Sequence, residues 1–194
     1  MTHITPRQRE AVPELAPMLQ MVEPSMGFLP TSMMTMAHWP ELTQAFGGLG
    51  ATILNSGELD PGLKQMIAFA VSNAAGCRYC QAHTAQSAQK NSVSAEKVQA
   101  VFEFESSDLF SDREKAAVRV AVHAGMVPNG VEAEHMTALS QHFSEKQAVE
   151  VVAVISLFGF LNRWNDTMAT TLESAPKHFA ADQLAFHGWV AGKH

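Results

Sequence analysis

The chain has 194 residues, of which 46% are hydrophobic and 16% are charged, as in an ordinary globular domain. Its net charge of −6 argues against nucleic acid as a partner, because nucleic-acid binders rely on a surplus of Lys and Arg. The longest apolar run, 151–161, is too short to span a membrane, and the N-terminus lacks the apolar core of a signal peptide, so we expect a cytoplasmic protein.

The first third of the chain is predicted to contain short helices separated by proline and glycine. Residues 1–13 are polar and contain two prolines, which predicts a loose arm. A short helix is expected over 14–22 and a second over 31–39. A third should begin at Pro40 and reach about residue 57, with apolar side chains on one face.

Residues 59–125 are predicted to form the core of the domain, and they begin with a helical hairpin. Asp60 is an expected N-cap, followed by Pro61 at the first helical position, and the helix that they open is almost wholly apolar to residue 74. After a break, a second helix begins at two cysteines and runs to about Lys90. The cysteines therefore lie at the start of a helix.

The rest of the chain is also predicted to be helical. The expected helices cover 94–104, 111–125, 132–142, 144–173 and a weaker stretch after Pro176. Serines are the expected N-caps of three of them, and two have capping-box partners, Glu114 and Gln147. The 144–173 helix is apolar almost all round to Leu161, so it should be central. No alternating strand pattern is present, and the predicted fold is a single all-α domain over 1–194.

A faint internal repeat relates two of the predicted helices. DPGLKQMIAFAVSNAAG, which begins at Asp60, is echoed by SDREKAAVRVAVHAG, which begins at Ser111. Lys64 aligns with Lys115 in this comparison. Only the first copy continues into cysteines, because the second has Val-Pro-Asn from Val127 at that place.

Cys77 and Cys80 are the only cysteines, and His83 follows one turn later. Positions i and i+3 are neighbours on a helix, so the two thiols can meet. The unpaired N–H groups and the positive dipole end of a helix N-terminus favour thiolate over thiol. This pattern predicts a redox dithiol, in which a thiolate attacks a peroxide or disulfide, the second thiol closes a disulfide and an external reductant resets the pair. His83 is placed to exchange the proton.

Two other interpretations of these residues stay open. In one, the cysteines are ordinary helix residues beside a surface histidine. In the other, Cys77, Cys80 and His83 bind zinc together with a distant fourth ligand such as His123. A c-type haem is excluded because Gln81, not histidine, follows the second cysteine, and we expect no bound cofactor.

The segment SNAAGCRYCQAHTAQ resembles the core of the alkylhydroperoxidase D (AhpD) and carboxymuconolactone decarboxylase-like family. GFLP and MAHWPEL upstream, and FLNRWNDTMATTLE and GWVAGKH downstream, extend the resemblance over most of the chain. It implies an all-α domain that assembles into dimers, trimers or hexamers. The peroxidase branch of the family forms a disulfide within CxxC, which makes Cys80 the peroxidatic and Cys77 the resolving cysteine. The dipole argument alone favours Cys77 as the attacking thiol.

Two positions depart from that branch. Its proton relay includes a glutamate 12 residues before the first cysteine, and this position is Gln65 here, which cannot exchange a proton as a carboxylate does. The family histidine follows the second cysteine by four residues, where this chain has Thr84, and His83 is displaced by about 100° around the helix. We therefore expect weak activity or another base, with Glu114 and Asp166 as candidates. Arg163 is a candidate for lowering a cysteine pKa.

The resulting hypothesis is a thiol-dependent peroxidase or disulfide oxidoreductase with Cys80, Cys77, His83 and Gln65 in its site. Its expected partners are a small-molecule peroxide, an external thiol or dithiol reductant and further copies of the chain, with no nucleic acid and no membrane. One alternative is a non-redox carboxymuconolactone decarboxylase-like enzyme in which His83 handles protons on a small acidic lactone. Another is a non-catalytic redox sensor whose disulfide changes assembly.

Overall fold

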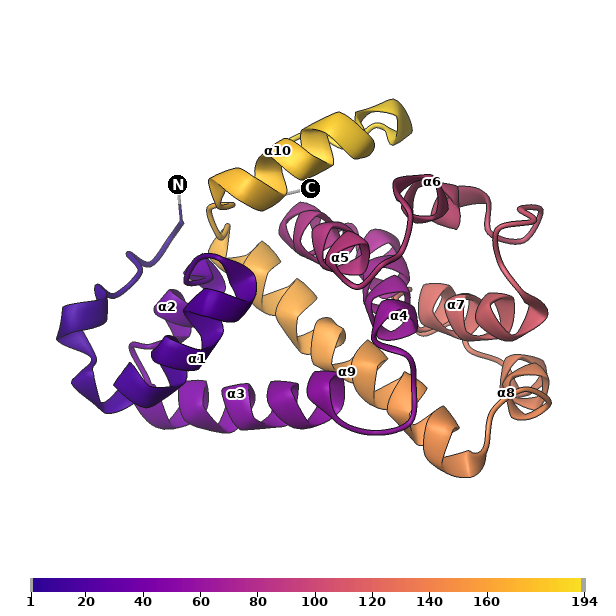
Figure 1. Ribbon diagram of the computed structural model, residues 1–194, viewed down its shortest axis with the longest axis horizontal. Coiled ribbons are helices and arrows are strands. Elements are labelled where there is room, and N and C mark those ends of the chain that lie inside the picture. The colour runs from indigo at the N-terminus through magenta and orange to yellow at the C-terminus, as the bar shows by residue number, and fades with distance from the viewer. Residues whose placement is uncertain (1, 193–194) are drawn as a thin grey trace.

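The structure is a computed structural model that describes residues 2–192, and no strand occurs among them. The all-α prediction is therefore confirmed (Figure 1). The α-helices are α1 (Ala16–Met26), α2 (Thr31–Met36), α3 (Pro40–Asn55), α4 (Pro61–Ala74), α5 (Arg78–Lys90), α6 (Ala95–Gln99), α7 (Asp112–Ala124), α8 (Ala133–Ser140), α9 (Glu145–Met168) and α10 (Ser174–Gln183). Four 3₁₀ turns are η1 (Arg9–Ala11), η2 (Pro13–Leu15), η3 (Ala100–Glu103) and η4 (Ala185–His187). No helix in 2–192 is both long and apolar enough to cross a membrane.

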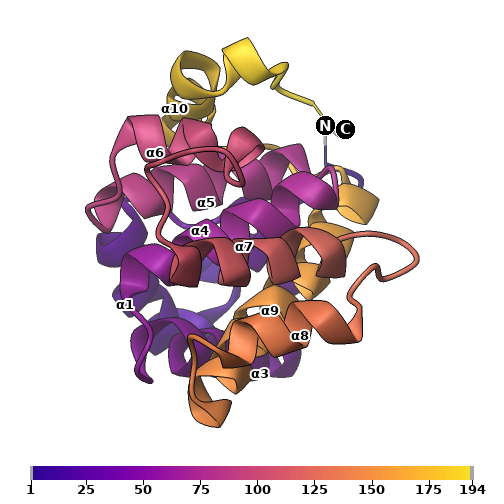
Figure 2. The same cartoon turned by 90° about the vertical axis from the view of Figure 1, so that its right-hand side faces the viewer.

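Helix α4 lies at the centre of the protein, in contact with α5, α7 and α9. Most of its side chains are buried because its sequence is apolar on nearly every side. The long helix α9 runs diagonally past it, with α1–α3 on one side and α7 and α8 on the other (Figures 1 and 2). Helix α5 follows α4 after a short connection, so it begins next to this central helix.

The predicted N-caps are confirmed. The side chains of Asp60, Ser94, Ser111 and Ser144 each accept a hydrogen bond from the backbone N–H three residues on. Ser111 and Ser144 also form the two predicted capping boxes. These starts depend only on neighbouring residues, so the sequence alone predicts them.

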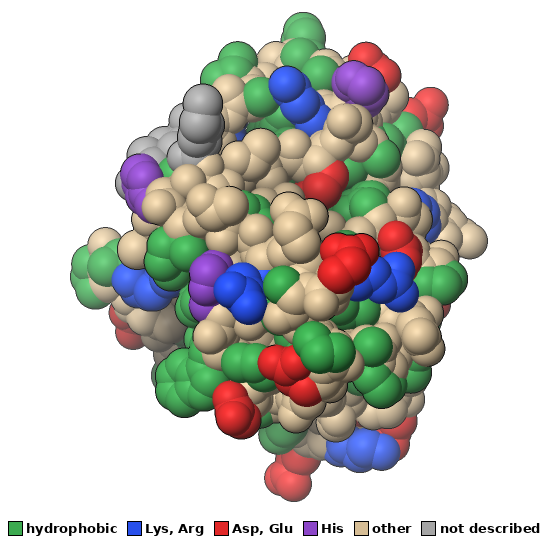
Figure 3. All heavy atoms as spheres, turned by 90° about the vertical axis from the view of Figure 1, so that its left-hand side faces the viewer, with side chains coloured by type: hydrophobic (Ala, Val, Ile, Leu, Met, Phe, Trp, Pro, Cys, Tyr) green, Lys and Arg blue, Asp and Glu red, His purple; other side chains and the backbone are tan. Residues whose placement is uncertain are grey.

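The N-terminal segment has more contacts than the expected loose arm. The backbone N–H of His3 donates to Met168 (2.8 Å), that of Arg7 donates to Met34 (2.9 Å), and Val12 is buried. The segment lies beside α1–α3 on a face where acidic, basic and apolar side chains are interspersed (Figure 3). Val12 packs in a buried apolar cluster with Leu19 and Met34, which gives the arm a fixed course.

Two helices end at places other than those predicted. Helix α1 continues through Pro24 to Met26, and it is followed by the C-cap Gly27, whose φ of +86° is readily adopted by glycine. Helix α9 ends at Met168, where Ala169 takes a left-handed conformation (φ +48°), and no helix forms over 169–173. The chain therefore leaves α9 before Glu173.

The internal repeat is visible in the structure. Helices α4 and α7 pack against each other. Lys64 Nζ donates to the carbonyls of Ile53 (2.8 Å) and Ser56, in the segment before its own helix. Lys115 Nζ likewise donates to Glu105 O (3.0 Å) before α7. The connections that follow the two helices differ, since residues 75–77 join α4 to α5 and residues 125–132 join α7 to α8.

Candidate functional site

The two cysteines lie at the start of α5, where a short turn follows α4. Gly76 adopts a φ of +76°, which lets the chain reverse within this turn. Cys77 is the N-cap of α5, and its Sγ accepts the backbone N–H of Cys80 (3.4 Å). Both cysteines are reduced and buried, with 1% and 2% of their surface exposed. The predicted dithiol is thus a close pair shielded from bulk water.

The surroundings of Cys80 keep its thiol protonated. Burial raises the pKa of Cys80 well above its ordinary value, and the hydrogen bond and charge of Cys77 raise it further. A hydrogen bond from Asn165 Nδ2 to Cys80 Sγ (3.3 Å) lowers this pKa, whereas the charge of Asp166 raises it. Burial outweighs the single stabilising hydrogen bond, so Cys80 is a thiol at neutral pH.

A cavity of about 320 Å³, here called the thiol pocket, lies next to the pair. Of the two cysteines, only Cys77 lines it. Asn165 and Thr170 also line the pocket, and the buried Asn165 Oδ1 and Thr170 Oγ1 have no hydrogen-bond partner among residues 2–192. The pocket is therefore lined by one cysteine and by two residues whose polar side-chain atoms are unused.

A carboxylate from the far end of the chain lies against α5. His83 Nε2 donates to Glu173 Oε2 (2.6 Å), and the hydroxyl of Tyr79 donates to Glu173 Oε1 (2.8 Å). The backbone N–H of Thr31 also donates to this carboxylate. The rings of Tyr79 and His83 stack with centroids 4.3 Å apart, and Phe28 meets His83 edge-on. We call Glu173, His83 and Tyr79 the carboxylate relay.

Electrostatics fix the protonation of two members of this relay. Burial raises the pKa of Glu173, but the hydrogen bond and charge of His83 and the N–H of Thr31 bring it below its ordinary value. Burial and the charge of Glu173 raise the pKa of Tyr79 well above 10. Glu173 is therefore a carboxylate and Tyr79 a neutral phenol that donates to it.

The other predicted residues have separate surroundings. Gln65 is half-buried on α4 and forms no side-chain hydrogen bond with any residue in 2–192. Glu114 binds Lys97 (2.6 Å) and caps α7 at Ser111, so it is a structural group. The ring of His123 stacks on His135. Among the described residues, no three His, Cys, Asp or Glu side chains are grouped so that they could hold a metal ion.

Sequence reasoning missed Glu173, Asn165 and Thr170 as site residues. Asn165 lies just before the end of α9, and Thr170 and Glu173 lie just after it. The sequence pattern predicts a helix to residue 173, whereas α9 ends at Met168. A helix that continued would have carried Glu173 away from α5. The early end of α9 is thus what completes the site.

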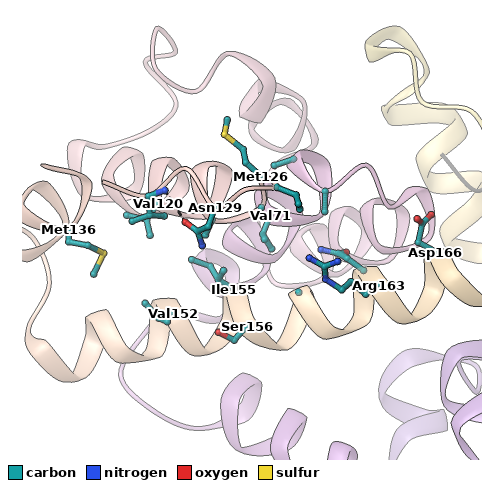
Figure 4. A pocket seen from close by; sticks show the side chains of 18 residues that line it. Val71, Val120, Met126, Asn129, Met136, Val152, Ile155, Ser156, Arg163 and Asp166 are labelled. Carbon is teal, nitrogen blue, oxygen red and sulfur yellow. Dashed lines mark hydrogen bonds between the residues drawn. The ribbon is translucent and has the colours of Figure 1, made fainter. Parts of the chain in front are cut away.

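A larger cavity, of about 610 Å³, lies between α4, α7, α9 and the loop 125–131 (Figure 4). We call it the α9 cavity. Arg163 and Asp166 both line it, and Asp166 also lines the thiol pocket. The two cavities therefore adjoin the same helix and share one residue.

Comparisons with known proteins place these features in a family. The model of the carboxymuconolactone decarboxylase family matches residues 40–123. The uncharacterized protein YnjA of Escherichia coli K12 is 29% identical over 110 residues, which are 57% of this chain and 60% of YnjA. The match thus spans less than two thirds of that relative.

Solved structures match over a greater length. The debrominase Bmp8, as a variant with one cysteine replaced by alanine and in complex with 2,3,4-tribromopyrrole, has a TM-score of 0.88 and 38% identity, covering 94% of this chain and 97% of Bmp8. An uncharacterized peroxidase-related protein with an AhpD core, from Ralstonia eutropha JMP134, has a TM-score of 0.80 at 21% identity, covering 90% and 94%. The second likeness shows the fold. The family match and the near-complete alignment with Bmp8 show that this chain belongs to the AhpD-like, carboxymuconolactone decarboxylase-like family.

Proposed function

We propose that the protein is a dithiol oxidoreductase that passes two electrons from Cys77 and Cys80 to a small molecule bound in the thiol pocket. The observation that carries this proposal is the position of the pair: two reduced, buried cysteines in N–H···S contact, one of which lines a cavity. A buried pair beside a cavity suits a reaction in which one thiol meets the substrate and the other closes a disulfide.

We assign the attack to Cys77. Cys77 lines the pocket, whereas Cys80 does not and is held as a thiol by its surroundings. The family resemblance gives the opposite order, with Cys80 as the peroxidatic cysteine, and the dipole argument agrees with Cys77. Asn165 Oδ1 and Thr170 Oγ1 are then free to bind polar atoms of the substrate.

With a peroxide as substrate, the Cys77 thiolate attacks one peroxide oxygen and the O–O bond breaks. The other oxygen leaves as an alkoxide that takes a proton, and Cys77 becomes a sulfenic acid. Cys80 then attacks the Cys77 sulfur, which forms the disulfide and releases water. Two thiol groups of an external reductant restore the pair.

The carboxylate relay supports the proton transfers. The family glutamate is replaced by Gln65, which forms no hydrogen bond to these residues, and we assign its role to Glu173. Glu173 fixes the ring of His83 through Nε2, one turn beyond Cys80. His83 is thereby oriented to supply or accept the protons that the reaction needs.

A brominated aromatic ring is a second candidate substrate, favoured by the 38% identity to a debrominase over almost the whole chain. Here the Cys77 thiolate attacks bromine, and the electrons of the C–Br bond stay on carbon, which takes a proton. Cys80 loses its proton, displaces bromide from the Cys77 sulfur and forms the disulfide. The electron balance is the same as for a peroxide, so the same pair serves both reactions.

The test is a thiol titration of the reduced protein before and after one equivalent of cumene hydroperoxide or, separately, of a polybrominated pyrrole. We expect two thiols to disappear together with the favoured substrate and to return with dithiothreitol. Cys77→Ser should slow the reaction by at least about 100-fold. In the Cys80→Ser variant, Cys77 should still react once with the substrate, and the reaction should then stop because no disulfide can form.

Ser87→Ala, on the same helix but outside the thiol pocket, is the control and should behave as the wild type. Two thiols that survive both reagents would rule the proposal out. Equal reactivity of the Cys77→Ser variant and the wild type would reverse the assignment of the two cysteines.

A further inference from the structure

The α9 cavity has no cysteine in its lining and takes no part in the proposed reaction. Much of its wall is apolar, and Figure 4 shows Val71, Val120 and Ile155 among the side chains around it. Its volume of about 610 Å³ is in the range of small-molecule sites. The cavity thus has the size and the apolar walls that an organic ligand requires.

Asn162 supplies the polar recognition group of this cavity. It lines the cavity, is only 3% exposed, and neither Nδ2 nor Oδ1 has a hydrogen-bond partner among residues 2–192. A buried amide group without hydrogen-bond partners destabilises the fold, so the presence of Asn162 at this buried position calls for an explanation. One turn further along α9, Asn165 uses its amide nitrogen on Cys80, and no such contact accounts for Asn162.

The two unused atoms of Asn162 are one donor and one acceptor. A hydroxyl group satisfies both, because its oxygen accepts from Nδ2 while its proton is donated to Oδ1. The neighbouring Arg163 forms no ion pair with a residue in 2–192, and its positive charge favours an acidic hydroxyl. An acidic hydroxyl on an apolar ring is a phenol.

We propose that the α9 cavity binds a small phenol and that Asn162 recognises its hydroxyl group. The apolar ring lies against Val71 and Ile155, and the hydroxyl faces the Asn162–Arg163 side of the cavity. This site is distinct from the thiol pocket, although Asp166 borders both. Binding at the α9 cavity requires no thiol chemistry.

The test is a titration of the reduced, full-length protein with phenol and with toluene, followed by NMR of labelled Ile and Met methyl groups. Ile155 and Met136 line the cavity and report on its occupation. We expect saturable shifts of both methyl signals, with toluene at least about tenfold weaker than phenol because it cannot bond to Asn162. A Cys77→Ser/Cys80→Ser double variant should bind phenol as the wild type does, so failure of the proposed function would leave this result intact.

Two variants locate the site. Asn162→Leu keeps a similar volume without donor or acceptor and should remove the preference for phenol over toluene. Gly159→Leu should abolish binding of both, because a side chain at this lining position extends into open space. Gly48→Leu is the matched control, since Gly48 lies on α3 with equal space around it and outside the cavity.

Four results would overturn the proposal. They are no methyl shift with either compound, equal affinity for phenol and toluene in the wild type, phenol binding that survives Gly159→Leu, and methyl signals that respond to protein concentration but not to ligand. The last would show that a second copy of the chain covers the cavity. Arg163→Met changes an exposed residue and leaves the core untouched. It should weaken phenol binding at high pH, so it tests the polar side of the cavity even if Asn162→Leu does not fold.

Discussion

The two copies of the internal repeat, α4–α5 and α7–α8, begin alike and continue differently. Each first helix is capped by its own N-cap side chain and carries a lysine that reaches back to the preceding segment. After α4, residues 75–77 turn the chain at once, so that Cys77 caps α5. After α7, residues 125–132 form a longer loop in which Val127 is 79% exposed.

This difference changes what each copy of the repeat encloses. The short turn brings the start of α5 directly against α4, which buries both cysteines and leaves only a small pocket beside them. The long loop starts against α4 at Gly125 and then lines the α9 cavity without filling it. The two copies therefore differ both in the length of this connection and in its sequence, since only the first has cysteines there.

The largest expected effect comes from the lysines that the two copies share. Lys64 is 2% exposed, donates to Ile53 and Ser56, and lies 3.8 Å from Glu150. Lys64→Met removes the donor to the Ile53 and Ser56 carbonyls and the cation beside Glu150, and it should lower the free energy of unfolding by about 3 kcal/mol. Lys115→Met removes a single hydrogen bond that is more exposed to solvent, and it should lower the free energy of unfolding by about 0.5 kcal/mol. Urea unfolding of both variants measures the difference, and equal losses would contradict it.

Glu173→Gln tests the carboxylate that completes the first copy. At pH 7 the variant loses the charged contact with His83 and should be about 2 kcal/mol less stable than the wild type. The folded-state pKa of Glu173 lies below its unfolded value of about 4.3, so the carboxylate stabilises the fold fully above that pH. This contribution is lost as the pH falls through the folded pKa, and the two proteins should converge there.

Glu105→Gln is the matched control on the second copy. Its pKa is also lowered, by the hydrogen bond to Arg119, but the pair is exposed to solvent. We expect a loss of about 0.5 kcal/mol at pH 7, reduced by added salt. Chemical unfolding at pH 3 to 7 distinguishes the two cases. A Glu173→Gln effect that does not change with pH would mean that the charge plays no part.

The smallest effect is expected at the turn itself. Gly76→Ala introduces a Cβ at a φ of +76°, and although nothing lies within 4 Å, the conformation costs about 1 kcal/mol. Gly50→Ala, in α3 and equally free of neighbours, should instead stabilise the protein by about 0.5 kcal/mol because alanine favours a helix. Thermal unfolding of both variants shows whether each substitution raises or lowers the stability. A stabilising Gly76→Ala would show that the turn can relax.

Local signals allowed the sequence to determine the helices and the cysteine pair. A cap such as Asp60 or Ser144 acts on a backbone N–H three residues away, and Cys77 and Cys80 are neighbours on any helix that contains them. These contacts form wherever the segment is helical, and the structure confirms them.

The tertiary structure alone decided which distant groups complete the site. Glu173 reaches His83 across 90 positions of the chain, and Asn165 reaches Cys80 across 85. The contact of Asn165 depends on how α9 packs beside α5. The contact of Glu173 depends on where α9 ends, and Ala169 carries no local signal for the left-handed conformation that ends it. At this helix end the backbone N–H groups of Ala169 and Thr170 donate to the carbonyls of Asp166 and Asn165. The contacts of Glu173, the thiol pocket and the α9 cavity join residues from several helices, so they exist only when the helices are assembled.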